Sequence, residues 1–416
     1  MIVLGTLFSG IGAIEQALLR LGIEHRIAFA CDNGDVEVDF LQGEELDEYK
    51  RLKKMRSKKL LKEESDIRRL AELNDMEAEV VDHIREVVFG LPTSLDKKRY
   101  VDELYRSRSR HKNFVKESYL ANYDVNENDF HLDVRFFDGS DYANQVDILV
   151  GGSPCQSFST VGAQCGLTDT RGTLFYEFAR IVQEVQPKVF IYENVRGLTT
   201  HDDGKTWDIM QRVFRNDLNY RITEPQVLNA CDYGIPQNRR RIFVIGIRND
   251  LNAHPFTYPQ PIDLHYTMQD FLEDNCAKGH FTFDHITGAI VIDPVPGKAD
   301  DKFTLTPAVQ QYVLAGGTAG YQTSTETDLP IARTLMKMMT QHHRAGVDNY
   351  ITVRRNPLRL RQLSDREALR LMGFPDSFEI VVSSMQMLRQ AGNSIVVDVL
   401  MAIVREIYNT GVFEDN

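Results

Sequence analysis

The sequence has few cysteines, no long apolar run and no excess of positive charge, and each shortage narrows what the protein can be. Its five cysteines are scattered over 416 residues without a CxxC pair, so neither a disulfide framework nor a metal site such as a zinc centre is expected. No run approaches the roughly 18 consecutive apolar residues of a membrane span, and the apolar start MIVLGTLFSG has no basic leader. We therefore expect an intracellular protein with free thiols and no membrane contact.

The excess of acidic residues bears on the partner. A formal net charge of −12 at pH 7 argues mildly against a nucleic acid, although a local basic surface decides phosphate binding more than the total charge does. At 416 residues and 42% hydrophobic composition, the chain is long enough for one large domain and a smaller one.

The N-terminal pattern is that of an α/β nucleotide-binding unit. Residues 2–8 form a short apolar stretch typical of a strand, SGIG predicts a tight loop, and AIEQALLRLG predicts a helix closed by Gly22. A second strand is expected over residues 26–32. Asp32 lies 22 residues after Gly10, close to the offset at which doubly wound folds place a carboxylate on a ribose. By itself, this pattern fits an ordinary strand-to-helix connection as well as it fits cofactor binding.

Between residues 46 and 88 the chain changes character. Apolar residues recur at three- and four-residue steps among dense Lys, Arg, Glu and Asp, which predicts helices that end at the GLP of residues 90–92. A solvated helical pair with one apolar seam and an arm that touches a partner or DNA both fit this pattern. The sequence does not choose between them.

Polar and nucleophilic residues accompany the next three predicted strands. Residues 130–138 carry Asp133, residues 146–152 precede Cys155, and residues 188–194 include Glu193. Because ligands in such sheets sit at the carboxyl ends of the strands, Cys155 and Glu193 are expected at one edge. A thiolate there can add to an electrophilic ring carbon while an acid protonates the ring nitrogen. Taken singly, a buried structural cysteine and a strand-end salt bridge are the alternatives.

Seven motifs together carry a family resemblance. In order and spacing they resemble the motifs of the DNA (cytosine-5) methyltransferases of bacterial or phage type that accompany restriction-modification systems. The motifs are LFSGIGAIEQAL, GGSPCQSFS, DTRGTLFYE, YENVRG, LNACDYGIPQNRRRIFVIG, LRQLSDREALRLMGFPDSF and QAGNSIVVDVL.

The resemblance implies a fold and a domain division. The fold is a Rossmann-like α/β sheet with helices on both faces, as in S-adenosylmethionine-dependent methyltransferases, plus a smaller irregular target-recognition domain and a helical insertion. The catalytic domain spans residues 1–250 with the insertion at about 40–95, the target-recognition domain spans 251–355, and residues 356–416 return to the catalytic domain with two helices. The final helix is expected beside the first strand.

The resemblance also assigns catalytic roles. Cys155 would attack C6 of a cytosine swung out of the duplex, and Glu193 would protonate N3, which makes C5 nucleophilic toward the methyl group of S-adenosyl-L-methionine. Arg241 would contact the flipped base and Arg239 would shape its pocket, while Arg240 faces away. A salt-bridge ladder on one strand face is the alternative for these arginines.

For the cofactor, the resemblance points to residues from several segments. Asp32 would hold the ribose hydroxyls, and Asn33 stands where many members have a large apolar residue that stacks on adenine. Thr6 and Ala13 also depart from the family, which often has a carboxylate and a glycine there. The other expected cofactor residues are Phe8, Ser9, Gly10, Ile11 and Gly12 at the methionine end with Asn393 and Ser394, Asp133 and Val134 at the adenine, and Pro154 and Leu174 along the slot.

A basic run inside this acidic chain predicts contact with double-stranded DNA. It lies in the variable segment that reads the target sequence in this family, and it is opposed only by Asp348. The run consists of Arg333, Lys337, Arg344, Arg354, Arg355, Arg359 and Arg361. Beside the nucleophile, Gln156, Ser157 and Ser159 are expected to touch DNA as well. A solvated charge run is the alternative.

The expected protein is thus a cytoplasmic, nucleoid-associated monomer on DNA, and whether a cognate restriction endonuclease is a further partner stays open. Two other functions stay open at this point. One is a tRNA cytosine-5 methyltransferase, whose recognition segment is typically short, and the other is a DNA-binding pseudo-enzyme without turnover.

Overall fold

The structure, a computed structural model, describes residues 1–153, 174–318, 321–322 and 324–414. Its centre is a mixed sheet of strand order β3-β2-β1-β4-β5-β9-β6, in which β7 also pairs with β9. Neighbouring strands from β3 to β5 are parallel, and β9 runs antiparallel to β5, β6 and β7. The strands are β1 (Ile2–Leu7), β2 (His25–Cys31), β3 (Phe130–His131), β4 (Ile148–Gly151), β5 (Val189–Val195), β6 (Tyr220–Ile222), β7 (Gln226–Asn229) and β9 (Arg240–Arg248).

The central strands form because they are apolar along their length. The residues ILVG of β4 and VFIY of β5 are almost fully buried, as expected for strands covered by helices on both faces. The strands predicted at residues 2–8, 26–32, 146–152 and 188–194 are confirmed, each to within two residues.

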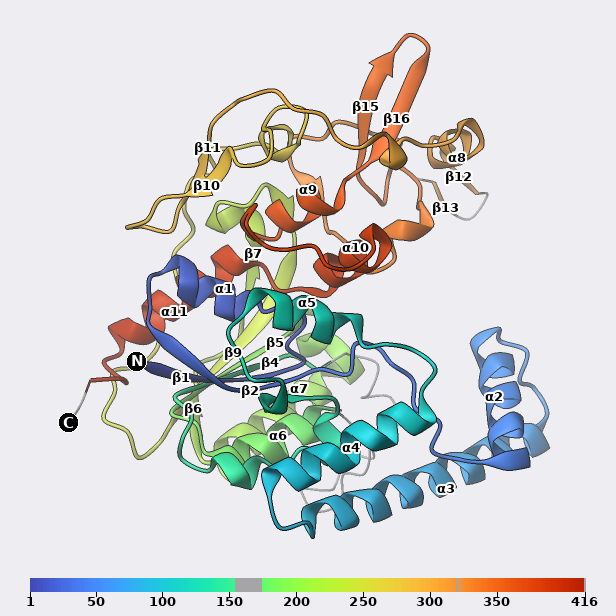
Figure 1. The fold of residues 1–416 in the computed structure, drawn as a ribbon, viewed down its shortest axis with the longest axis vertical. Helices are drawn as coiled ribbons and strands as arrows, with labels where there is room; N and C mark the ends of the chain where they lie inside the picture. The colour runs from blue at the N-terminus through green and yellow to red at the C-terminus, as the bar shows by residue number, and fades with distance from the viewer. Residues whose placement is uncertain (154–173, 319–320, 323, 415–416) are drawn as a thin grey trace.

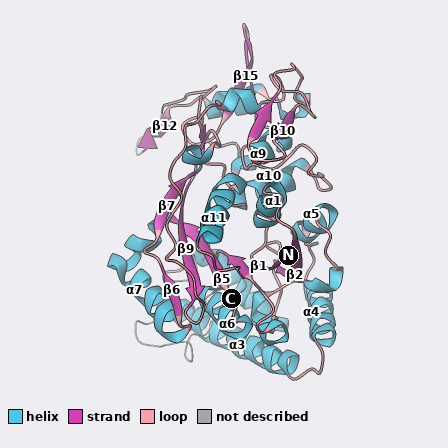
Figure 2. Cartoon of the chain, turned by 90° about the vertical axis from the view of Figure 1, so that its left-hand side faces the viewer, coloured by secondary structure: helices cyan, strands magenta, loops and turns pink. Residues whose placement is uncertain are grey.

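Helices cover both faces of the sheet (Figures 1 and 2). In both views α1 and α11 lie on one side of the strands and α6 on the other. Each face has its own apolar cluster: Ile14 and Leu400 belong to the first, and Phe178 and Trp207 to the second. The helices outside the insertion are α1 (Ala13–Arg20), α5 (Phe114–Asn122), α6 (Leu174–Val185), α7 (Lys205–Arg212), α8 (Pro307–Val313), α9 (Asp365–Arg370), α10 (Ser384–Asn393) and α11 (Val397–Asn409).

The C-terminal helix is a core element of this layer. Helix α11 packs against α1, and the buried Arg20 of α1 forms an ion pair with Asp398 of α11 at 2.8 Å. The stretch Ser384–Asn409 is long and apolar enough to span a membrane by composition, but 72% of its most apolar window is buried inside the protein. Three helices, not the predicted two, occupy the last segment, because Gly373 with a φ of 85° ends α9 and the Ser383 side chain, which accepts a hydrogen bond from the Gln386 amide, starts α10 as a separate helix.

The helical insertion is longer than predicted. Helices α2 (Gly43–Ser57) and α3 (Glu64–Phe89) match the periodic segment, but a third helix, α4 (Ser94–Arg108), follows the GLP stop. Helix α4 begins there because the Thr93 side chain accepts a hydrogen bond from the Asp96 amide and caps the new helix. The helical insertion therefore reaches Arg108, not residue 95.

The third predicted strand is mostly absent. Only Phe130–His131 pair with β2, whereas residues 130–138 were expected to form a strand. The Asp133 side chain accepts a hydrogen bond from the Arg135 amide and caps a short 3-10 turn, which takes the chain away from the sheet. An aspartate that bonds its own backbone thus overrides the extended pattern.

The recognition segment is irregular, as the resemblance implied, and consists of short strands, loops and the short helix α8. It joins the sheet domain through β14, which pairs with β8 just before Arg239. Its long hairpin, β15–β16, projects from the top of the molecule in Figure 1. Its strands and their partner are β8 (Gln237–Asn238), β10 (Phe281–Phe283), β11 (Ile290–Ile292), β12 (Gly317–Thr318), β13 (Tyr321–Gln322), β14 (Ala332–Arg333), β15 (Tyr350–Arg355) and β16 (Leu358–Gln362). The exact domain boundaries stay a prediction.

Candidate active site

The loop between β1 and α1 is pinned to the end of β2. The Gly10 amide donates to Asp32 Oδ2 at 2.8 Å, and the Cys31 amide donates to Ser9 Oγ at 2.9 Å. Gly10 and Gly12 have positive φ, and a Cβ at Gly12 would collide with the ring of Tyr123. The glycines are therefore required by the turn, and the loop presents its backbone at the carboxyl end of the sheet.

A hollow opens beside this loop and is closed by remote segments. Its walls come from β1 and its loop, from the end of β4, and from the chain between α10 and α11. It is lined by Thr6, Leu7, Phe8, Ser9, Gly10, Ala13, Ile14, Val150, Gly151, Gly152, Asn393, Ser394, Ile395 and Leu400. Five of the predicted cofactor residues thus share one hollow, together with Thr6 and Ala13. Ile11 is fully buried and supports the loop from below.

Asp32 and Asn33 have different surroundings. Asp32 Oδ1 accepts from the Gly34 amide at 2.7 Å. Burial raises the pKa of Asp32, although the hydrogen bonds from the Gly10 and Gly34 amides oppose the shift. Asn33 is exposed, and its side-chain oxygen accepts from the Asp35 amide at 3.0 Å. Asn33 therefore caps a turn here.

Asp133 is held from behind by the helical insertion. Tyr105 of α4 donates to Asp133 Oδ2 at 2.8 Å, and Arg135 forms an ion pair with it at 2.7 Å. Burial alone would raise the pKa of Asp133, but the charge and hydrogen bonds of Arg135 lower it below its usual value. The adjacent Val134 is buried, and its carbonyl accepts a hydrogen bond from the Arg180 guanidinium at 2.8 Å.

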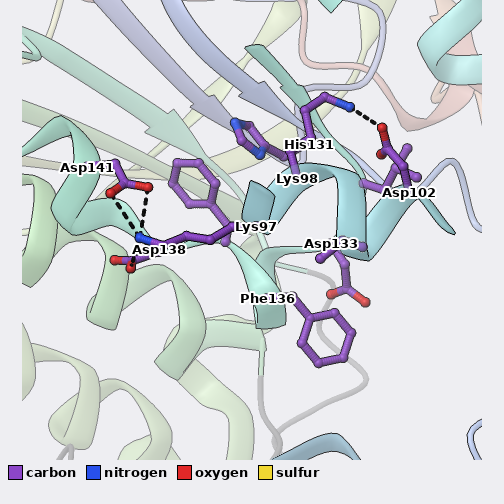
Figure 3. A pocket seen from close by; sticks show the side chains of 11 residues that line it. Lys97, Lys98, Asp102, His131, Asp133, Phe136, Asp138 and Asp141 are labelled. Carbon is purple, nitrogen blue, oxygen red and sulfur yellow. Dashed lines mark hydrogen bonds and ion pairs between the residues drawn. The ribbon is translucent and has the colours of Figure 1, made fainter. Parts of the chain in front are cut away.

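Figure 3 shows the ion pairs that attach α4 to residues 138–141, which follow Asp133 in the chain. Lys97 reaches Asp138 at 2.6 Å and Asp141 at 2.9 Å, while the buried Lys98 bonds Asp102 at 2.5 Å within α4. Asp133 and His131 line the same small pocket. The insertion is thus part of the support of the predicted adenine-binding segment.

Glu193 and two arginines form a compact charged group. Arg241 Nε lies 3.1 Å from Glu193 Oε1. Arg239 is buried and donates to the carbonyls of Leu335 at 2.8 Å, Gly392 at 3.0 Å and Ser394 at 2.7 Å. Arg240 is exposed between them, as the alternation predicted.

Burial controls the charge states in this group. Burial raises the pKa of Glu193, and the attraction of Arg241 and then of Arg239 only partly offsets the shift. Burial, together with repulsion from Arg241, lowers the pKa of Arg239 to about 9, so Arg239 remains charged at neutral pH. Glu193 is therefore a carboxyl group that holds a proton more readily than an exposed one.

The end of β4 lies directly beside Glu193. A Cβ at Gly152 would stand 2.7 Å from the Glu193 carbonyl oxygen and 2.9 Å from its Oε2. The Asn194 side chain donates to the Ser153 carbonyl at 3.0 Å and fixes the last described residue of this strand end. Pro154, Cys155, Gln156, Ser157 and Ser159 lie outside the described residues. Leu174 begins α6 and is half-buried against the second apolar cluster.

The predicted DNA-contacting cations lie at different depths. Arg354 and Arg355 are exposed near the tip of the β15–β16 hairpin. Lys337 pairs with Asp35 at 2.6 Å, Arg333 is half-buried near Glu326, and the Arg344 guanidinium lies 5.6 Å from the centre of the Tyr312 ring.

The prediction that Arg361 belongs to the DNA-contacting basic run is wrong. It is buried and pairs with Asp274 and Glu367, each at 2.7 Å. Asp274 belongs to the recognition segment and Glu367 to α9, so this guanidinium fastens the recognition segment to the C-terminal segment and is not available to a phosphate.

Three aromatic supports of the site had no signal in the sequence. The Tyr123 hydroxyl donates to the carbonyls of Ile11 at 3.0 Å and Gly12 at 2.6 Å, and Tyr119 donates to the buried Glu15. Together with Tyr105, they come from α4, α5 and the residue after α5, far from β1 in sequence. Only their contacts identify them.

Comparisons with known proteins identify the family of the chain. The sequence model of the family described as C-5 cytosine-specific DNA methylase matches residues 102–409. The chain is 34% identical over 276 residues to the Type II methyltransferase M.HpaII of Haemophilus parainfluenzae, which covers 63% of this chain and 72% of that protein. It is 36% identical over 265 residues to the Type II methyltransferase M.HhaI of Haemophilus parahaemolyticus, covering 64% and 76%.

Solved structures share the fold. The S. pombe Dnmt2 methyltransferase superposes with a TM-score of 0.58 at 16% identity over 98% of both chains. A putative DNA modification methyltransferase encoded within an E. coli prophage gives 0.55 at 18% identity over 99% of both. These likenesses support the α/β methyltransferase fold, and the sequence match decides the family. The chain belongs to the C-5 cytosine-specific DNA methylases.

Proposed function

We propose that this DNA cytosine-5 methyltransferase of the restriction-modification type acts on a cytosine swung out of duplex DNA, through a covalent bond between Cys155 and C6. The observation that carries the proposal is the position of Glu193. Its carboxyl group, with a raised pKa, lies against Gly152, three residues before Cys155 in the sequence. An acid and a nucleophile at one strand edge suit addition to the cytosine ring.

The hollow beside the β1 loop fits S-adenosyl-L-methionine. Backbone groups of Ser9 and Gly10 and the polar side chains of Ser9 and Asn393 suit the charged amino-acid end, and Asp32 stands at the next strand end with lone pairs free for ribose hydroxyls. When bound, this cofactor supplies an electrophilic methyl group. Ile11 and Gly12 support the loop, Leu174 and Pro154 belong to the proposed slot, and Asn33 offers no apolar face for adenine.

Asp133 and Val134 are proposed for the adenine end. Both carboxylate oxygens of Asp133 already accept hydrogen bonds from Arg135, and one of them also accepts from Tyr105. Each oxygen can accept more than one donor, so an adenine amino group can share this carboxylate.

The proposed reaction begins at Cys155. Its thiolate forms a bond to C6, the electron pair of the ring moves through C5 and C4 onto N3, and N3 takes the proton of Glu193. C5 is then nucleophilic and would take the methyl group of S-adenosyl-L-methionine, whose sulfur would keep the electrons of the broken bond and leave as the neutral thioether. A solvent water takes the C5 proton, the thiolate departs from C6 and restores the C5=C6 double bond, and N3 returns its proton to Glu193.

The two arginines have separate tasks in this proposal. Arg241 is half-buried and next to Glu193, so its guanidinium can bind the flipped base and keep the carboxyl oriented. Arg239 shapes the pocket because it ties three backbone carbonyls together. Flipping costs a few kcal/mol, which contacts to the base edge recover.

Contacts to the duplex are proposed for the recognition segment and the residues after Cys155. Arg354 and Arg355 on the projecting hairpin are the exposed candidates, with Lys337, Arg333 and Arg344 nearer its base. Gln156, Ser157 and Ser159 are assigned to the target strand. The proposed enzyme is a cytoplasmic, nucleoid-associated monomer on DNA that is accompanied by a restriction endonuclease.

Nucleoside mass spectrometry tests the function. Purified protein and S-adenosyl-L-methionine are incubated with mixed-sequence duplex DNA and, separately, with total tRNA. We expect 5-methyldeoxycytidine in the DNA with the wild type and none with Cys155→Ala.

The same experiment has contrary outcomes. Methylated cytidine in tRNA alone would mean that the substrate is wrong, and no product in either would leave a DNA-binding protein without turnover. Cys231→Ala is the matched control, because this half-buried thiol lies on the loop after β7 and is bonded to Asn229. It should keep full activity.

A further inference from the structure

The C-terminal half of α2 and the turn that follows it carry an unusual concentration of positive charge. Residues 50–62, KRLKKMRSKKLLK, hold eight of the 48 Lys and Arg side chains of the protein and none of its 60 Asp and Glu. We call this stretch the basic tip. It stands out because the whole chain has a net charge of −12.

Most of this charge is exposed and unpaired. Within the described part of the chain, five exposed cations of the basic tip pair with no carboxylate: Lys54, Arg56, Lys58, Lys59 and Lys62. The other three pair with Asp39, Asp66 and Glu77 at 2.7, 3.5 and 3.8 Å. Cations in the last turn of α2 complement the helix dipole, but Lys58, Lys59 and Lys62 lie beyond that helix, so the dipole does not explain them.

Helices α2 and α3 form a rigid arm that holds the basic tip away from the core. Helices α2 and α3 have their own small apolar cluster, centred on Leu52 and Leu73, which is separate from the clusters of the sheet. At its other end α3 is anchored, because Ile84 and Val88 belong to the main core and Arg85 donates to the Arg135 carbonyl at 2.8 Å. With 26 residues, α3 spans about 39 Å, so the tip is far from its anchor.

The α2 end of the insertion and part of the recognition segment lie toward the same side in the view of Figure 1. In Figure 1, α2 stands at the right of the molecule, on the side where α8, β12 and β13 lie above it. The chain that leads into α2 also touches the recognition segment, since Asp35 pairs with Lys337 at 2.6 Å. A duplex bound between the recognition segment and the sheet domain can therefore extend toward the basic tip.

We infer that the basic tip binds the phosphate backbone of the duplex that flanks the target, without reading its sequence. The inference rests on the DNA methylation proposed above. Exposed lysines on a rigid arm are point charges suited to phosphates and supply no base-edge readout. The arm thus adds affinity for long duplexes and leaves the chemical step unchanged.

Binding to DNA at several salt concentrations tests the inference. The triple variant Lys54→Gln/Lys58→Gln/Lys59→Gln removes three charges. Lys54 is the one of the three inside α2, and glutamine there is compatible with the helix. With a mixed-sequence 40-base-pair duplex and fluorescence anisotropy, we expect the slope of log Kd against log salt to fall by about 2 to 3, and Kd at 0.1 M salt to rise by about 10²- to 10³-fold, because that slope acts over the decade between 1 M and 0.1 M salt. In methylation assays KM for DNA should rise by the same factor, with kcat unchanged.

The control removes three exposed cations at the amino ends of strands, away from the carboxyl ends where the site lies. The variant Arg26→Gln/Arg215→Gln/Arg221→Gln changes β2, β6 and the turn before β6, at the starts of strands and away from the site. It should bind DNA with the wild-type slope, and both variants should unfold at the wild-type urea midpoint.

Two results would overturn the inference. One is wild-type affinity and slope in the tip variant, and the other is a tip variant that loses binding to total tRNA but keeps full affinity for DNA. If the wild type binds duplex DNA but yields no methylated cytosine, the proposed function fails, while the comparison of slopes still decides the role of the tip.

Discussion

Glu193 shows how a single carboxyl group is adapted to give a proton. Its burial raises its pKa, whereas an exposed glutamate would be ionised and unable to protonate N3 at neutral pH. We expect Glu193→Gln to lower the single-turnover methylation rate by about 10² to 10⁴, with DNA affinity within about threefold of the wild type. The wild-type rate should fall as pH rises through the raised pKa.

Glu224→Gln serves as the control for this variant, because Glu224 is exposed and pairs with Arg215 at the surface. Its rate should match the wild type. A Glu193→Gln rate within tenfold of the wild type would contradict the role of Glu193 as proton donor.

Glu15 makes the stability of the protein depend on pH. It lies fully buried beneath the β1 loop, and burial raises its pKa from 4.5 to about 7 although the Tyr119 hydrogen bond opposes the shift. The folded protein therefore keeps a proton that the unfolded chain releases above pH 4.5. Stability from this group is complete below about pH 4.5 and is lost as pH rises toward 7, by up to about 3 kcal/mol.

Glu15→Gln should remove this pH dependence. We expect its urea midpoint to change less than that of the wild type between pH 5 and pH 8, and to exceed the wild type at pH 8. The exposed Glu24→Gln should behave as the wild type does. Parallel pH profiles of wild type and Glu15→Gln would show that Glu15 is ionised in the folded state.

At the scale of residues, motif positions could be predicted and their supports could not. Gly10, Gly12 and Glu193 stand at strand ends that a periodic pattern locates, so their shared edge follows from the sequence. Tyr123 and Tyr105 depend on how α4 and α5 pack, and a tyrosine on a helix carries no mark of its distant partner.

Among the elements, α4 has the most direct effect on the proposed cofactor site. Its Tyr105 hydroxyl donates to Asp133, which the proposal places at adenine. We expect Tyr105→Phe to raise KM for S-adenosyl-L-methionine five- to tenfold, roughly the effect of one ordinary lost hydrogen bond because Tyr105 acts through Asp133, and to leave kcat within twofold. Steady-state kinetics at saturating DNA measures both.

Tyr100→Phe is the control on the same helix, because Tyr100 is exposed and should tolerate the change without effect. A fall in kcat with unchanged KM in Tyr105→Phe would mean that α4 acts on the chemical step and not on cofactor binding.

Element by element, the apolar strands were predictable and the irregular parts were not. The strands β1, β2, β4 and β5 follow from their continuous apolar runs. The strand expected over residues 130–138 stops early because Asp133 bonds its own backbone, and α4 restarts after a stop signal because Thr93 caps it. Local side-chain hydrogen bonds of this kind compete with the pattern of hydrophobicity.

On the scale of the whole molecule, the two ends of the chain meet in one core. Residues Asn393 and Ser394 line the same hollow as the β1 loop, and α11 packs on α1. The motif order suggested this return, but nothing in the sequence indicated the ion pair that fastens it. Arg20 also donates to the carbonyls of Gly373 and of Gly288 in the recognition segment, so one guanidinium joins three parts of the chain.

The pair Arg20–Asp398 should therefore be a determinant of global stability. Both side chains are nearly buried, so Asp398→Asn leaves an uncompensated buried charge and should lower the free energy of unfolding by about 3 to 5 kcal/mol, measured by urea denaturation. The double variant Arg20→Met/Asp398→Leu removes both charges and should recover part of the loss, because a desolvated pair is replaceable by apolar groups.

Asp250→Asn breaks the exposed pair with Arg248 and should cost less than about 1 kcal/mol. Comparing the stability of Asp398→Asn with that of Asp250→Asn distinguishes a buried ion pair that stabilises the fold from a surface ion pair that contributes little. If Asp398→Asn unfolds at the same urea concentration as Asp250→Asn, the C-terminal helix is held by its apolar face alone, through Val399, Leu400 and Ile403, and the ion pair only sets its direction.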